Sequence, residues 1–135
     1  MAKVIFDFEE LVEIVVCNRL LPGPIVRARV KGDRINLVIR TGSFVLPFIP
    51  ASLKYLRFED SRAVFELAVV SNLVSKAVSR LSQMFGAEMP TYVKLEYPNI
   101  SVDIDRLLAE RNIRGVRVKE IFLENGEFTV ITENT

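Results

Sequence analysis

Histidine and tryptophan are both absent from the sequence, and Cys17 is its single cysteine. Without histidine, the chain lacks the commonest general base, the commonest transition-metal ligand and the Ser-His and Cys-His nucleophile arrangements. One cysteine cannot form an intramolecular disulfide or a cysteine-based metal cage. Because Cys17 follows Val15 and Val16, and Arg19 is the one nearby cation, we expect a small buried hydrophobe rather than an activated thiolate.

Charge of either sign is nearly balanced. The chain has 18 Lys plus Arg and 17 Asp plus Glu, a net charge of +1, so no global field attracts nucleic acid or an anionic membrane. The length of 135 residues fits a single α+β domain, residues 1–135, without a second core. The N-terminal stretch is acidic where a signal peptide needs a basic region, and no apolar run approaches the ~18 residues that span a bilayer, so we expect a cytoplasmic protein.

Apolar residues are abundant for a small domain. They make up 50% of the chain, and the mean hydropathy is +0.26. A small domain has a large surface for its volume and should need polar cover. A homodimer interface, a cavity for an apolar ligand, a membrane-facing edge or an unusually full core would each account for the surplus.

The clearest single element is a helix over Ser71–Gly86. Ser71 can accept a hydrogen bond from a free backbone N–H as N-cap, and Gly86 can adopt the left-handed conformation that ends a helix. Apolar residues recur at spacings of three and four, which predicts one buried face. That face comprises Leu73, Val74, Ala77, Val78, Leu81, Met84 and Phe85.

A second helix is predicted near the N-terminus. Asp7 and Glu10 form a pair typical of a capping box, which places the helix start at Phe8 and its end at about Leu20. The β-branched run within this segment lowers its helical propensity. A strand from Lys3 to Phe8 that leads into a shorter helix is the alternative.

Elsewhere the apolar residues alternate with a period of two, which predicts antiparallel hairpins. The turns fall at 32–33, 60–61 and 125–126, and Pro98 separates two further short strands. We expect Asp105 to cap a short helix that extends to about Glu110. The predicted fold class is α+β, a mainly antiparallel sheet of about six or seven strands curved around the Ser71–Gly86 helix.

The first hairpin has a basic outer face. Its cations could bind the phosphates of nucleic acid or lipid headgroups. A solvated face whose charges pair with glutamates elsewhere is the alternative, and nucleic acid is disfavoured because no surface aromatics alternate with the cations to stack on bases. The cations at issue are Arg27, Arg29, Arg34 and Arg40.

An apolar segment with two prolines follows this hairpin, over Thr41–Ser52. Pro47 and Pro50 argue against an ordinary central strand, so a loop or crossover is predicted. Its large apolar side chains should cover the core, face a partner, or enter a ligand site or a membrane. They are Phe44, Val45, Leu46, Phe48 and Ile49.

Few residues are arranged for chemistry. Asp103 and Asp105 share one strand face and could act as an acid/base pair or bind a hard cation, but no further oxygen ligand is near them. A surface charge and a helix cap explain both. The glycines are scattered at turns and form no phosphate-binding loop. We therefore expect no metal, no cofactor and no enzymatic activity of its own.

The sequence resembles bacterial members of the tubular lipid-binding (TULIP-like) superfamily. The resemblance is carried by ISVDIDRLL followed by GVRVKEIFLENGEFTV, with LPFIP before a strand. In that superfamily an antiparallel sheet wraps a long helix, and the space between them holds acyl chains. The resemblance implies a lipid-binding domain.

Together these patterns lead to one functional hypothesis, a non-catalytic domain with a hydrophobic cleft. The cleft would bind an acyl-like ligand or a partner's apolar segment, with basic residues holding an anionic headgroup, and peripheral membrane contact would be compatible with it. The alternative is an assembly protein that forms a homodimer through its apolar surplus and binds no small molecule. The predicted site residues are Phe44, Leu46, Phe48, Ile49, Leu73, Leu81, Met84, Phe85, Arg27, Arg29, Arg34 and Arg40.

Overall fold

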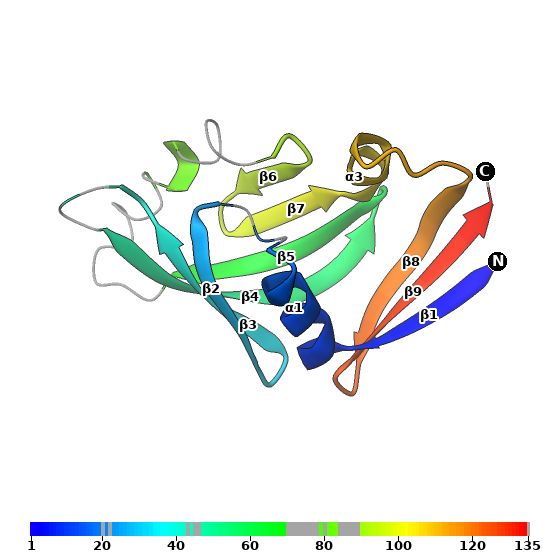
Figure 1. Cartoon of the computed structure of the whole chain (residues 1–135), viewed down its shortest axis with the longest axis horizontal. Coiled ribbons are helices and arrows are strands. Elements are labelled where there is room, and N and C mark those ends of the chain that lie inside the picture. The colour runs from blue at the N-terminus through cyan, green and yellow to red at the C-terminus, as the bar shows by residue number, and fades with distance from the viewer. Residues whose placement is uncertain are drawn as a thin grey trace.

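A computed structural model of the chain describes residues 1–19, 21, 23–42, 44, 47–69, 79, 81–83 and 90–134. Within them, nine strands form two antiparallel sheets (Figure 1). The α+β class and the mainly antiparallel pairing predicted from the hairpins are confirmed. The prediction of about six or seven strands is wrong, because the described residues form nine strands, six in one sheet and three in the other.

The larger sheet has six strands in the order β2-β3-β4-β5-β7-β6. Two-residue turns at 32–33 and 60–61 connect β2 to β3 and β4 to β5, as predicted. Pro98 lies between β6 and β7, whose hairpin folds back so that β7 pairs with β5. The strands are β2 (Ile25–Lys31), β3 (Arg34–Arg40), β4 (Phe48–Glu59), β5 (Arg62–Val69), β6 (Val93–Glu96) and β7 (Asn99–Asp103).

The smaller sheet has the order β1-β9-β8 and brings the two ends of the chain together. Strand β1 (Ala2–Asp7) pairs antiparallel with β9 (Glu127–Asn134), and β8 (Val116–Glu124) pairs with the other edge of β9. Asn125 and Gly126 form the β8–β9 turn, both with positive φ (51° and 76°). The predicted Asn-Gly hairpin is therefore confirmed.

Helix α1 (Phe8–Cys17) follows β1 directly. Its N-cap is Asp7, whose carboxylate accepts a hydrogen bond from the backbone N–H of Glu10 at 3.1 Å, as the sequence pattern predicts. The backbone N–H of Phe8 donates to the carbonyl of Gly126 at 2.9 Å, which attaches the helix start to the β8–β9 turn. A strand leading into a shorter helix, the alternative from the sequence, is what the structure contains.

Helix α3 (Ile104–Glu110) follows β7. Its N-cap is Asp103, which accepts from the backbone N–H of Arg106 at 3.1 Å, whereas Asp105 lies within the first turn. The prediction that Asp105 caps this helix is wrong by two residues. The helix begins at Ile104, one residue before Asp105, and the backbone N–H of Ile104 donates to the carbonyl of Ser61 at 3.0 Å.

Most of the predicted helix over Ser71–Gly86 lies outside the described residues. Ser79 and residues 81–83 are described and helical. Leu81 is fully buried (0% exposed). Of the side chains named for the buried face, Leu73, Val74, Ala77, Val78, Met84 and Phe85 lie outside the described residues.

The core consists of two clusters of buried residues. One joins Leu81 to the inner face of the six-stranded sheet, through Ile39, Ile49, Ala51, Leu67 and Ile100. The other lies where α1 and the two sheets meet, and its aromatic rings pack edge to face, with centroids 5.0 Å apart for Phe8–Phe128 and 5.2 Å for Tyr55–Phe128. Both clusters bury the apolar faces that the alternation predicts.

Two further predictions from the sequence are wrong. Strand β4 begins at Phe48, so the second half of the predicted loop Thr41–Ser52 belongs to a strand. Pro50 is tolerated because the described pairing of β4 with β5 begins only at Ala51, so the missing N–H interrupts no described bond on that side. Cys17 is exposed rather than buried, since it is the last residue of α1.

Candidate functional site

The inner face of the six-stranded sheet lines a cavity of about 690 Å³. Along β3, Ile35, Leu37 and Ile39 line it, while the residues between them point to the opposite face. The paired strands contribute in the same way, because cross-strand partners share a face. Their lining side chains are Ile25, Leu53, Phe65, Leu67, Val93, Ile100 and Val102.

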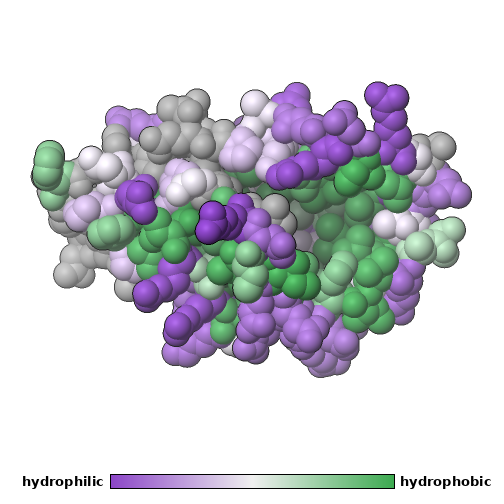
Figure 2. Space-filling view, in the orientation of Figure 1, coloured by the Kyte–Doolittle hydropathy of each residue, from purple (hydrophilic) through white to green (hydrophobic). Residues whose placement is uncertain are grey.

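Elements outside the sheet close the other sides of this cavity. Val15 comes from α1, and Leu107 and Leu108 come from α3. Leu21, Pro24, Tyr92, Arg111 and Ile113 complete the described lining. Figure 2 shows hydrophobic side chains gathered in the region of α1 and α3, with hydrophilic side chains around them.

The described lining is almost wholly apolar. Its polar side chains are Tyr92 and Arg111, and Arg111 is its charged one. A volume of this size lies within the range of small-molecule sites, which are largely apolar and have few polar groups that fix orientation. The described lining has no set of groups arranged for proton transfer or nucleophilic attack.

The predicted site residues divide between the cavity's side of the sheet and the outside. Ile49 and Leu81 are fully buried in the core cluster that shares Ile39, Leu67 and Ile100 with the cavity wall. They pack against residues of the cavity wall but do not belong to its described lining. Leu46 lies outside the described residues, as do Leu73, Met84 and Phe85.

Phe44 and Phe48 lie outside the cavity. Phe44 is fully exposed and Phe48 is half exposed. Phe48 pairs with Arg40 across β3 and β4, so its side chain is on the outer face of the sheet, opposite the cavity. The structure does not bring this part of the predicted site together with the apolar cavity.

The predicted basic residues also lie on the outer face. Arg27 and Arg29 pair with Val38 and Asn36, which alternate with the cavity-lining residues of β3. Arg34 and Arg40 share this face by the same alternation. The sequence hypothesis assigned an anionic headgroup to these arginines, provided that their face adjoined the mouth of the cleft. The alternation instead places the sheet between these arginines and the cavity.

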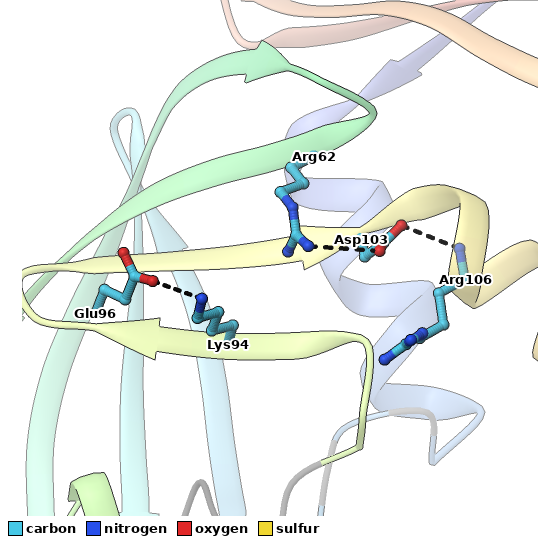
Figure 3. A network of polar contacts seen from close by, with 5 residues as sticks. All are labelled: Arg62, Lys94, Glu96, Asp103 and Arg106. Atoms are coloured by element: carbon cyan, nitrogen blue, oxygen red, sulfur yellow. Dashed lines mark hydrogen bonds and ion pairs between the residues drawn. The ribbon is translucent and has the colours of Figure 1, made fainter.

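The ionisable groups at the β6–β7 edge form surface pairs (Figure 3). Arg62 lies 3.7 Å from the carboxylate of Asp103, and Lys94 lies 2.7 Å from that of Glu96. The hydrogen bond and charge of Lys94 lower the pKa of Glu96. Asp103 is occupied by its capping bond and its ion pair, and within the described residues no group of three or more His, Cys, Asp or Glu could hold a metal ion.

A second hollow, of about 650 Å³, lies between β4 and β8. Tyr55 crosses it, and its hydroxyl donates to the carbonyl of Ile121 at 2.5 Å. Burial, with the charge of Glu120 as a smaller cause, raises the pKa of this hydroxyl. The hollow also contains Asp33 and Lys54, 3.9 Å apart, and this mixed lining makes it a less apolar site than the cavity.

Sequence reasoning missed Arg111 and the α3 contribution to the cavity. Leu107 and Leu108 are in a helix of seven residues, too short for its apolar periodicity to show which side is buried. A lone arginine after a short helix carries no pattern at all. The alternation of apolar residues along the strands, including those on either side of Pro98, was the signal that located part of the wall.

Comparisons with known proteins give no relative for this chain. No family model matches it, and no curated protein or solved structure is significantly similar. Among the described residues, no helix combines the length and the apolar character needed to cross a membrane. The site is therefore interpreted from its own geometry.

Proposed function

We propose that this protein is a non-catalytic binding domain for an acyl-like apolar ligand, held in the cavity on the inner face of the six-stranded sheet. The observation that carries this proposal is a space of about 690 Å³ whose described lining contains a single charged side chain. Water in such a space finds few hydrogen-bond partners. Displacement of this water by an apolar ligand is therefore favourable and contributes to binding.

The resemblance to tubular lipid-binding domains supports the same kind of ligand. In the proposed arrangement, the six-stranded sheet curves around the Ser71–Gly86 helix, whose Leu81 packs on the sheet beside the cavity. In this arrangement the described members of the Phe44–Ile49 segment, Phe44, Phe48 and Ile49, are not part of the described cavity lining. Its buried member, Ile49, packs in the core cluster that includes Ile39 of the cavity wall.

A pair of tryptophan substitutions tests this proposal. Val93 lines the cavity from β6, and its neighbour Lys94 is exposed on the opposite face. Val93→Trp should fill part of the space and weaken the binding of a fluorescent acyl probe at least about tenfold, whereas Lys94→Trp should leave its affinity unchanged. Native mass spectrometry of the unmodified protein should show a co-purified apolar ligand.

Equal probe affinity in the two variants would contradict binding in this cavity. Circular dichroism and thermal melts of both variants show whether Val93→Trp keeps the fold. If it does not, Val102→Phe is a smaller substitution of another lining residue with the same expected effect. An empty protein that also binds no apolar probe would favour the alternative, an assembly protein without a small-molecule ligand.

The outer face of β2 and β3 favours a second candidate function, contact with an anionic membrane surface. Arg27, Arg29, Arg34 and Arg40 share this face, and in the described part of the chain none of them forms an ion pair. The exposed ring of Phe48 lies beside Arg40 in register. Basic residues attract acidic headgroups, and an exposed aromatic ring beside them can enter the interface.

Vesicle cosedimentation tests this candidate. The protein should bind vesicles containing phosphatidylserine, release them at high salt, and ignore neutral phosphatidylcholine vesicles. Arg27→Gln with Arg40→Gln should reduce binding severalfold, while Lys119→Gln on β8 should not. Phe48→Ser should weaken binding even at low salt. Equal sedimentation with both vesicle types, or retention on duplex DNA instead, would contradict it.

A further inference from the structure

Arg111 is the residue at which charge meets the apolar cavity. It is the C-cap of α3, and its backbone N–H donates to the carbonyls of Leu107 (3.1 Å) and Leu108 (3.2 Å). Both of those residues also line the cavity. Arg111 is exposed and yet forms part of the described lining, so it lies at the rim of the cavity.

No acidic side chain of the described residues neutralises this arginine. It forms none of the ion pairs found in the described part of the chain, and the described lining contains no carboxylate. Glu110, its neighbour in sequence, instead accepts a hydrogen bond from the hydroxyl of Thr91 at 2.6 Å. Arg111 therefore brings a charge without an ion pair among the described residues to the edge of an apolar space.

The dipole of α3 accounts for only part of this placement. A cation is stabilised near a helix C-terminus, but the effect is modest on a seven-residue helix and requires no cavity. The guanidinium is planar and presents paired donors that match a carboxylate in a two-bond geometry. Beside apolar walls such a pair is partly removed from water, which strengthens it relative to an exposed ion pair.

We infer that the ligand is a single-chain carboxylate amphiphile, of the fatty-acid class, with its chain in the cavity and its carboxylate on Arg111. This inference rests on the proposed function, because the chain must first occupy the cavity. In this inference the anionic headgroup pairs with Arg111 at the rim of the cavity rather than with the arginines of the outer face. It also makes Arg111 a specificity residue, since the apolar walls alone cannot distinguish an acid from its ester.

The test compares a long-chain fatty acid with its methyl ester at neutral pH, by displacement of a fluorescent acyl probe. The unmodified protein should bind the acid about tenfold more tightly than the ester. Arg111→Gln should remove this preference by weakening the acid alone, and the affinity for the ester should stay within about twofold. Arg114→Gln is the matched control, because Arg114 is exposed three residues later and does not belong to the described lining.

The possible failures are distinguishable. If the acid and the ester both bind with equal affinity, or if Arg111→Gln keeps the preference, the assignment of Arg111 is overturned and the cavity function stands. If neither ligand displaces the probe, both are overturned. Arg111→Lys should keep part of the preference, because it keeps the charge but loses the paired donors. A loss of preference in Arg114→Gln would also overturn the assignment.

Discussion

The carboxylate of Asp103 serves two structural roles at the junction of β7 and α3. One oxygen accepts the backbone N–H of Arg106 at 3.1 Å, and the other lies 3.7 Å from the guanidinium of Arg62 (Figure 3). The ion pair is partly exposed and contributes little to stability. The capping bond satisfies a backbone donor that has no partner within the helix, so it is the more important of the two.

Asp103→Ala should therefore lower the free energy of unfolding by about 1 kcal/mol. Asp103→Asn should cost much less, because its amide oxygen still accepts from the N–H of Arg106. Asp105→Ala is the control, since Asp105 lies inside the first turn and is not the N-cap. Urea denaturation measures all three. A larger loss for Asp105→Ala than for Asp103→Ala would place the cap at the residue first predicted from the sequence.

Leu81 tests the packing of the described part of the segment predicted to form a helix over Ser71–Gly86. It is fully buried against the inner face of the six-stranded sheet. Leu81→Ala should lower the free energy of unfolding by roughly 2 to 5 kcal/mol, since it removes buried contacts and leaves a cavity. Ser82→Ala, at an exposed neighbouring position, should change it by less than about 0.5 kcal/mol. Equal effects would mean that Leu81 is not a core residue.

At the scale of elements, Tyr55 connects the two sheets. Its ring packs against Phe65 and Phe128 at centroid distances of 5.4 and 5.2 Å, and its hydroxyl donates to the carbonyl of Ile121 on β8. Tyr55→Phe keeps the ring contacts and removes the hydrogen bond. The free energy of unfolding should fall by about 0.5 to 1.5 kcal/mol.

The pH dependence of stability provides a second measurement at Tyr55. Burial raises the pKa of its hydroxyl in the folded state above the value of about 10 in the unfolded chain. Above that pH the unfolded chain loses the proton while folded Tyr55 keeps it, so stability falls as the pH rises. The decline should be shallower in Tyr55→Phe than in the unmodified protein. Identical slopes from pH 9 to 11 would contradict the raised pKa.

The elements that the sequence predicted well are those encoded by neighbouring residues. The Asn125-Gly126 turn needs positive φ at both positions, and the Asp7 cap needs an acceptor before the first free N–H, so both can be recognised locally. The interpretation of Pro50 was wrong because a proline is incompatible with a strand only at positions where a backbone N–H must donate to the neighbouring strand. Which side of β4 is paired at that residue depends on β5, far along the chain.

At the scale of the whole molecule, the sequence was least informative about which segments meet. The pairing of β1 with β9 joins the two ends of the chain, and alternation in either strand names no partner. The same limit applied to the site. The residues of β3 that face the cavity could be recognised from the alternation. The position of α3 and Arg111 at this cavity depends on the β5-β7-β6 strand order, which the turns alone do not determine.

The cavity and the homodimer are two explanations for the same apolar surplus, and the solution mass distinguishes them. Large exposed hydrophobic residues in the described part are spread over β1, α1, β2, β4 and the loops, whereas the cavity gathers its apolar side chains on one concave surface. A stable dimer usually needs a well-packed interface above about 1,000 Å². We therefore expect a monomer of 15.3 kDa in sedimentation equilibrium at micromolar concentration.

Addition of a fatty acid should raise the melting temperature without changing that mass, because the ligand binds the folded state alone. A tight dimer whose melting temperature ignores fatty acid would instead assign the surplus to an interface between copies of the chain.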